Sequence, residues 1–457
     1  MGAGCTISSN KNFLSMQVLS PQKKANMKAH DQSRTSNKMD QSEMVMPNNQ
    51  PLIDEQDFSP KFEENHLKKL QIGKFLTPNN NHPTKSYWKV YLNGVNTANE
   101  VLFRLRDLYK NNPKFFSSNL EKFGAPENFR WESWYLICGD GYPSSVLEEK
   151  NFVNRLFYET ISSKDCKSEE DIKKDIFRTF PKHPYFSEIE QKTEGDQINT
   201  LEVMSKEMGN IRLYRLLKAI ANQYPHIGYC QGMNFIFGFI LAVSGGKECQ
   251  TFQLVMKLAE APKFRIMGFY ENGFPLMKLY CFIFYKILDK KNKKLAKHLK
   301  DVDLPDSIWL TKWVLTMLIY SFPFELSLRL WDFIIGSENL FNLIKICLEL
   351  LRCFEKSIMQ KDAMEIADFL REISDNKDML NDKKSASYID PELVIKKARK
   401  IKLTEKMIGK FTKEFIASLE RDEEKQNENF LFYQEFGKNT SVKKNKKKVG
   451  KGKNKDL

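Results

Sequence analysis

One stretch of this sequence displays a polar side chain where the backbone cannot continue a helix. In residues 227–234, Gln231 lies between Gly228 and Gly232, shortly after Pro225 and just before an apolar run. Proline and glycine interrupt helices, and glycine lets the backbone approach another molecule closely. Gln231 is therefore predicted to lie on a loop between two helices, available for contact with a second molecule.

A second stretch, residues 172–183, places an acid and a base one helical turn apart, with Pro181 just beyond them. The helix that carries Asp175 is expected to end close to Arg178. An arginine can stabilise charge that builds up on phosphoryl oxygens, and a glutamine can orient an attacking water. Taken singly, an Asp and an Arg three residues apart are ordinarily a surface ion pair, and a glutamine between glycines is ordinarily a turn residue.

Together the two stretches resemble the TBC domain, the catalytic domain of GTPase-activating proteins for Rab-type small GTPases. That family has an arginine motif, Ile-x-x-Asp-x-x-Arg, and a glutamine motif, Tyr-x-Gln-Gly. Here the motif positions are filled by Ile172, Asp175, Arg178, Tyr229, Gln231 and Gly232. A third family motif, Arg-x-x-x-Trp, is matched by Arg130 and Trp134 near the start of the resemblance, which covers roughly residues 114–374.

The resemblance implies a role for each motif residue. Arg178 would be an arginine finger and Gln231 a glutamine finger, both supplied to the nucleotide site of the GTPase. Asp175 would hold Arg178 through a charge-assisted hydrogen bond. The other supporting positions are Ile172, Tyr229, Gly232 and Asn234 beside the fingers and, as structural supports, Arg130 and Trp134.

The implied function is acceleration of GTP hydrolysis by a Rab-family GTPase, in the regulation of vesicle trafficking. GTP and Mg²⁺ would belong to the GTPase, and no cofactor or metal of the chain's own is expected. The histidines lack zinc-ligand spacing, and residues 241–248 fail the phosphate-loop pattern at both ends. The alternative function is a catalytically inactive TBC-fold module that binds a GTPase or a scaffold partner at a membrane. A nucleophilic Cys230 has no local signature in its favour.

The elements that must position these residues are predicted to be helical. Strand signals are almost absent, so the fold class is all-α, and the resemblance implies many helices in two subdomains, with both fingers in the first. Capping boxes are predicted at Thr97 with Glu100 and at Ser168 with Asp171. Helices are expected over residues 98–109, 211–223, 276–288, 309–320, 326–335, 340–354 and 363–373, and a basic helix from Asp390-Pro391 past Leu419.

Composition and the resemblance together predict six segments. They are a disordered N-terminal segment (1–60), an extension with one helix (61–113), the TBC domain (114–374), a linker (375–387), a C-terminal helical extension (388–430) and a disordered lysine-rich tail (431–457). The net charge is +14, and nine lysines lie between residues 438 and 455. Lysines without interleaved aromatics offer little base-reading chemistry, so no specific nucleic-acid partner is expected.

The first six residues fit the N-myristoylation pattern, with Gly2 as the acylated residue and Cys5 as a neighbouring palmitoylation site. One acyl chain binds membranes only marginally, and Cys5 together with the lysines of the first thirty residues would strengthen the anchor. The eight cysteines show no disulfide framework, and no secretory signal begins the sequence. The expected location is therefore cytoplasmic, peripheral on the cytosolic face of an endomembrane or the plasma membrane, beside a prenylated GTPase.

Overall fold

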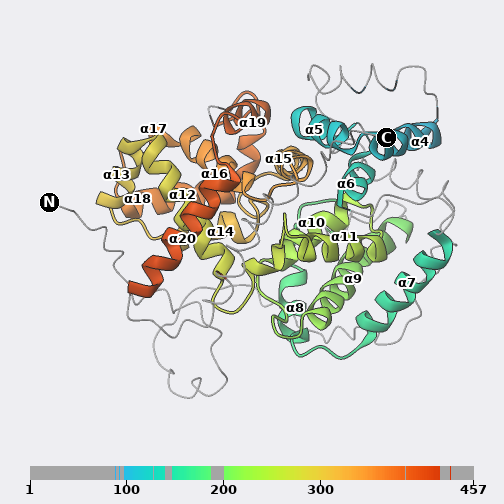
Figure 1. The fold of residues 1–457 in the computed structure, drawn as a ribbon. Helices are drawn as coiled ribbons and strands as arrows, with labels where there is room; N and C mark the ends of the chain where they lie inside the picture. Colours follow the sequence, from blue (N-terminus) through green and yellow to red (C-terminus); the bar gives the residue numbers. More distant parts are fainter. Residues whose placement is uncertain are drawn as a thin grey trace, which may run out of the picture. The chain divides into compact units, whose positions relative to one another are not determined.

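The computed structural model describes residues 88, 92, 97–126, 128–138, 147–186, 200–385, 387–421 and 433, without the side chains of 147–153, 200–208 and 420–421. These residues belong to one compact unit, residues 52–457. Every regular element among them is helical, which confirms the all-α class (Figure 1). The predicted lipidation sites Gly2 and Cys5 and the lysine-rich tail lie outside the described residues. Within the described part, no helix combines the length and the apolarity needed to span a bilayer.

The first group of helices includes a long helix, α9, with α7, α8, α10 and α11 around it (Figure 1). It consists of α4 (Ala98–Asn111), α5 (Pro113–Phe123), α6 (Arg130–Cys138), α7 (Leu147–Ser163), α8 (Glu169–Ile176), α9 (Thr200–Gln223), α10 (Met233–Val243) and α11 (Glu248–Glu260). Helices α7, α8, α10 and α11 all pack against α9. Nearly every residue of α10 is apolar and buried, as is expected of a helix in the centre of a core.

The second group is built around α12 and α16. It consists of η3 (Ile266–Phe269), α12 (Pro275–Lys291), α13 (Lys293–Asp301), η4 (Asp306–Ile308), α14 (Leu310–Leu315), α15 (Phe324–Gly336), α16 (Asn342–Cys353), α17 (Glu355–Ile358), α18 (Ala363–Asp375), η5 (Lys377–Leu380), α19 (Pro391–Ala398) and α20 (Glu405–Arg421). Helix α15 joins the two groups, because it packs against α5 and α6 on one side and α16 and α19 on the other. Both predicted finger residues fall in the first group.

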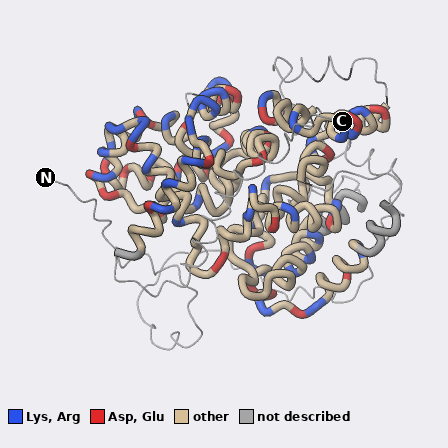
Figure 2. The backbone as a smooth tube through the Cα atoms, in the orientation of Figure 1, with Lys and Arg blue, Asp and Glu red and all other residues tan. Residues whose placement is uncertain are grey.

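Charge is spread over the helices of both groups. Figure 2 shows lysines and arginines intermixed with aspartates and glutamates along the described helices. Helix α13 shows the pattern at short range, because Leu295 and Leu299 are buried while Lys293, Lys294 and Lys297 are exposed. Such amphipathic helices bury one apolar stripe and leave their charges in water.

The two predicted capping boxes have different outcomes. Thr97 and Glu100 form the reciprocal pair of hydrogen bonds at the start of α4, each at 3.2 Å, so the first prediction is confirmed. The second prediction is wrong. Ser168 holds the N-cap position of α8, but its ψ of 11° is not the extended conformation that brings a hydroxyl over the third amide, and its side chain makes no capping bond.

The helix predicted over residues 309–320 is also wrong, because α14 ends at Leu315. Met317 and Leu318 then adopt left-handed backbone conformations, with φ of 45° and 74°. Both side chains are buried, and the Trp331 indole donates a hydrogen bond to the Met317 carbonyl at 3.3 Å. Tertiary packing therefore overrides the helical preference of this apolar run.

The C-terminal segment forms two helices rather than the single one predicted. The predicted start is confirmed, since Asp390 caps α19 and Pro391 is its first residue. The chain leaves the helix after Ala398 and buries Ile401 and Leu403 before α20 begins. Helix α19 packs against α15 and α16, and α20 packs against α12, so residues 391–421 contribute directly to the core of the second group.

Neighbouring residues of α19 provide a matched test of this packing. Ile395 is 2% exposed, whereas Leu393 is 45% exposed. Replacing Ile395 with alanine should lower the free energy of unfolding by about 2–5 kcal/mol, because it leaves a cavity, whereas Leu393→Ala should cost less than about 1 kcal/mol. Urea denaturation followed by circular dichroism measures both. Equal, small effects would mean that α19 is only appended to the domain.

Candidate functional site

The arginine motif covers the C-terminal part of the short helix α8 and the turn after it, and one face of this helix is buried. Ile172 and Ile176 of α8 are fully buried, and the chain leaves the helix directly after Ile176. The Arg178 amide bonds to the Asp175 carbonyl at 3.2 Å, and two residues later Phe180 turns the backbone with a left-handed φ of 48°. The Arg178 side chain is 69% exposed, so it projects from the turn into solvent.

Asp175 contacts both motifs, but not in the way predicted. Its Oδ1 lies 3.6 Å from Nη1 of Arg178, which is an ion pair and not the predicted charge-assisted hydrogen bond. Its Oδ2 accepts a 2.7 Å hydrogen bond from the Tyr229 hydroxyl. Burial, reinforced by this carboxylate, raises the pKa of Tyr229 well above its ordinary value, so the phenol remains a donor. The stronger contact of Asp175 is therefore its hydrogen bond to Tyr229, which lies in the glutamine loop, residues 227–232.

The glutamine loop begins where α9 ends. The amides of Ile227 and Gly228 both bond to the Tyr224 carbonyl, and Gly228 has a left-handed φ of 65°. Gly232, with a φ of 110°, closes the loop and starts α10. Between them Gln231 is exposed, as predicted from the flanking glycines.

A buried chain of hydrogen bonds ties this loop to the arginine turn. The Asn234 Oδ1 accepts a hydrogen bond from the Gly232 amide at 3.1 Å. Its Nδ2 donates a hydrogen bond to the Thr179 hydroxyl at 2.9 Å. Thr179 donates in turn to the Asp175 carbonyl at 2.9 Å. Sequence reasoning did not single out Thr179, because its signal, a polar residue among buried neighbours, appears only in the fold.

The cysteine in the loop is unsuited to nucleophilic chemistry. Cys230 is largely covered, and burial raises the pKa of its thiol to about 11. The Asp175 carboxylate acts in the same direction. A reactive cysteine needs the opposite shift, toward the thiolate, so the loop presents Gln231 and not Cys230 as its chemical group.

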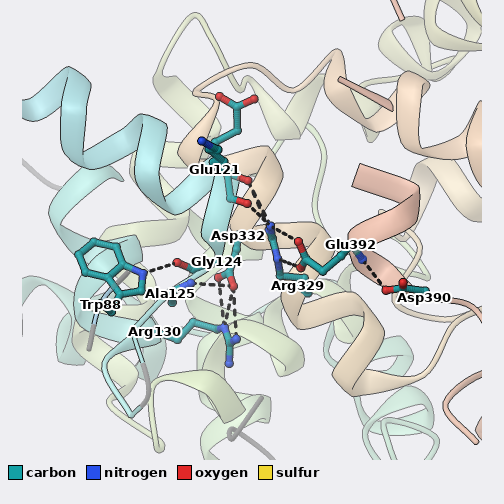
Figure 3. Close-up of polar contacts among 10 residues, drawn as sticks. Trp88, Glu121, Gly124, Ala125, Arg130, Arg329, Asp332, Asp390 and Glu392 are labelled. Atoms are coloured by element: carbon teal, nitrogen blue, oxygen red, sulfur yellow. Dashed lines mark hydrogen bonds and ion pairs between the residues drawn. The ribbon is translucent and has the colours of Figure 1, made fainter. Parts of the chain in front are cut away.

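Arg130 and Trp134 lie around a different carboxylate, that of Asp332 in α15. Figure 3 shows Asp332 with Arg130 and Ala125. The Arg130 Nε lies 3.1 Å and the Trp134 Nε1 lies 2.7 Å from Oδ1 of Asp332, and the Ala125 amide donates to Oδ2 at 3.1 Å. Asp332 is completely buried. Within the described part of the chain, the side-chain hydrogen bonds of Arg130 and Trp134 go to Asp332 and not to Arg178 or Gln231, so these two residues fasten α6 to α15.

Figure 3 also shows how segments outside the motifs join this cluster. The Trp88 indole donates to the Gly124 carbonyl at 2.8 Å, and Arg329 of α15 forms an ion pair with Glu392 of α19. The sequence signal for Asp332 was available, since an acid inside an apolar helix is expected to be buried and paired. The partners of Asp332 could not be predicted from the sequence, because they lie about 200 residues away from it.

A model of the Rab-GTPase-TBC domain matches residues 127–359, just over half of the chain. The chain belongs to the Rab-GTPase-TBC domain family. The matched region contains the arginine, glutamine and Arg-x-x-x-Trp motifs, and it ends after α17. Helices α4, α5, α18, α19 and α20 therefore lie beyond the part that the family model describes.

Individual proteins of this family are distant from the chain. It is 26% identical over 269 residues to TBC1 domain family member 1 of Mus musculus, covering 58% of the chain and 20% of that protein. It is 25% identical over 266 residues to the GTPase-activating protein GYP5 of Saccharomyces cerevisiae, covering 58% of the chain and 26% of that protein. The chain thus spans about a fifth to a quarter of the length of these curated relatives.

Two solved structures are similar to the chain. The Chlamydomonas flagellar RabGAP TBC domain has a TM-score of 0.48 and 19% sequence identity, over 74% of this chain and 95% of that one. The Ypt/Rab-GAP domain of Gyp1p has a TM-score of 0.48 and 18% identity, over 69% of this chain and 96% of that one.

Asp332→Asn tests the buried cluster of this TBC domain. The substitution leaves the Arg130 guanidinium buried without its counter-charge, which should lower the free energy of unfolding by about 3–5 kcal/mol. The control is Asp368→Asn on α18, where Asp368 pairs with Arg371 at the surface and the expected loss is at most about 1 kcal/mol. Chemical denaturation compares the two, and equal losses would contradict a supporting role for the cluster.

His183, five residues after Arg178, should make stability depend on pH. Burial lowers the pKa of its imidazole to about 4, and the ring packs against Phe324 at a centroid distance of 4.4 Å. The unfolded chain, with a histidine pKa of about 6.5, binds the proton first, so stability falls as pH decreases from about 6.5 toward 4, by up to roughly 3 kcal/mol.

Denaturation midpoints between pH 7 and pH 4.5 measure this loss. His183→Asn should flatten the profile, because asparagine does not titrate. The control His226→Gln should leave it steep, since His226 is exposed. If the His183→Asn protein keeps the slope of the parent, other groups cause the acid sensitivity.

Proposed function

We propose that this chain is a GTPase-activating protein that accelerates GTP hydrolysis by a Rab-type small GTPase, with Arg178 and Gln231 acting in trans. The observation that carries the proposal is the shared hydrogen-bond network of the two motifs. Asp175 bonds to Tyr229 and Thr179 bonds to Asn234. Asp175, Thr179 and Asn234 are buried and Tyr229 is partly buried, while Arg178 and Gln231 remain exposed. Because one hydrogen-bond network supports both loops, the exposed side chains of Arg178 and Gln231 are suited to enter a site on another protein together.

The separate roles of Arg178 and Gln231 follow from the chemistry of phosphoryl transfer. Charge accumulates on the oxygens of the transferred phosphoryl group, and the guanidinium of Arg178 would stabilise it. The Gln231 amide would orient the attacking water, and GTP and Mg²⁺ would be held by the GTPase. The similarity of the chain to GYP5, a GTPase-activating protein, supports the same class of activity.

A membrane location is part of the proposal. Acylation of Gly2 and Cys5, together with the lysine-rich tail, would hold the protein on the cytosolic face of an endomembrane or the plasma membrane, where vesicle trafficking is regulated. Tethering to the surface that carries a prenylated GTPase raises the effective concentration of the pair. The second candidate is a binding module without activity. The exposed Arg178 and Gln231 favour an activator, since pure binding needs neither of them.

Single-turnover hydrolysis of GTP on a panel of Rab-type GTPases tests the activity. The parent protein should accelerate at least one GTPase. Arg178→Ala should reduce the stimulated rate by about 10³-fold or more, and Gln231→Ala should reduce it by roughly 10²- to 10³-fold, as when one transition-state donor is lost. The matched controls, Arg371→Ala and Gln360→Ala, change exposed residues on and before α18 and should retain the rate of the parent.

Binding of the GTP-bound partner, measured on the same variants, separates the two candidates. An activator keeps its affinity when Arg178 or Gln231 is replaced and loses rate. If a GTPase binds and no variant or parent accelerates hydrolysis, the inactive-module function takes its place.

A further inference from the structure

We infer that Ser168 is a positioning residue for Gln231, acting through the backbone of Tyr229. The inference rests on the proposed function of the finger residues. Ser168 lies at the N-cap of α8, where sequence reasoning assigned it to a capping box. Its Oγ instead accepts a hydrogen bond from the Tyr229 amide at 3.1 Å, across 61 residues of sequence.

This contact differs from the other amide contacts of the glutamine loop. The amides of residues 227 and 228 bond to the carbonyl of Tyr224, the residue that follows α9. The Cys230 amide bonds to the Met233 sulfur and the Gly232 amide to the Asn234 side chain, and both acceptors lie on α10. The Tyr229 amide is therefore the point, two residues before Gln231, at which the loop backbone is fixed to the arginine-bearing helix.

Tyr229 is held by α8 at both of its ends. Its amide bonds to Ser168 and its hydroxyl bonds to Asp175. Ser168 and Asp175 are seven residues apart, which is about two helical turns and places them on the same face. The tyrosine consequently lies along α8. The Asp175 contact holds its hydroxyl, and the Ser168 contact holds its backbone, which continues to Gln231.

The serine itself is firmly placed. The next residue, Glu169, accepts a hydrogen bond from the Tyr214 hydroxyl and forms an ion pair with Lys218 at 3.7 Å, both on α9. On the loop side, a Cβ at Gly228 would lie only 2.9 Å from the Ser168 Oγ. Glycine therefore lets the loop approach the Ser168 hydroxyl closely, while the neighbouring Glu169 ties this end of α8 to α9.

Removal of the hydroxyl should affect the finger without unfolding the helix, because Ser168 makes no side-chain capping bond to α8. Ser168→Ala should lower the saturating single-turnover rate of GTP hydrolysis by about 3- to 10-fold, in line with the loss of one hydrogen bond. Affinity for the GTP-bound partner should stay unchanged. Ser168→Thr, which keeps the hydroxyl, should restore most of the rate, and Ser163→Ala, an exposed serine of α7, should match the parent.

The double variant decides whether Ser168 acts through Gln231. In the Gln231→Ala background, adding Ser168→Ala should produce no further loss of rate. In the Arg178→Ala background, it should still produce the 3- to 10-fold loss. The inference is overturned if Ser168→Ala lowers the rate of the Gln231→Ala protein by the same factor as that of the parent. It is also overturned if Ser168→Ala weakens affinity for the partner and leaves the saturating rate unchanged.

Amide hydrogen exchange gives a readout that requires no GTPase. Peptides covering residues 225–233 should exchange faster in Ser168→Ala than in the parent, while peptides from α10 should not change. Unchanged exchange would show that the contact does not hold the loop and would overturn the inference. Failure of the proposed function looks different, because the parent itself would then accelerate no GTPase.

Discussion

The hydrogen bond between Asp175 and Tyr229 is the constraint on which the site depends. It joins segments 54 residues apart, and it uses the carboxylate that sequence reasoning assigned to Arg178. A buried acceptor must be satisfied, and the phenol satisfies it at 2.7 Å. Arg178 is left with a longer ion pair and an exposed side chain. The acid therefore fixes the geometry of the two loops and holds the arginine only loosely, which leaves the guanidinium available to a phosphate.

A second buried acid, Asp332, has the same function at the junction of the two helix groups. Its two oxygens accept bonds from α6 and from the turn after α5, while Arg329, one turn earlier on α15, reaches α19 (Figure 3). Both acids are costly to bury and become stabilising only when every partner is in place. The loops that carry Arg178 and Gln231, and the junction of the two helix groups, are thus each specified by one carboxylate.

Much of this arrangement could be predicted from the sequence. The helical class, the cap at Thr97, the start of α19 at Asp390 and the exposure of Gln231 between two glycines follow from local chemistry, and the structure has all of them. The failures share one cause. The Ser168 hydroxyl bonds to a loop 61 residues away, and Met317 and Leu318 leave the helical conformation because their side chains enter the core. Local preference cannot predict such contacts, because the winning partner is distant in sequence.

The bond from the Ala125 amide to Asp332 has a consequence for how the protein is made. It spans 207 residues, and α5 packs against the same helix, α15, so closely that a Cβ at Gly336 would lie 2.3 Å from the Glu121 amide nitrogen. At ribosomal rates of 5–20 residues per second, α5 emerges about 10–40 s before its packing partner exists. During that interval the face of α5 that α15 later covers is open, so chaperones that bind nascent chains should engage this protein through its first helices.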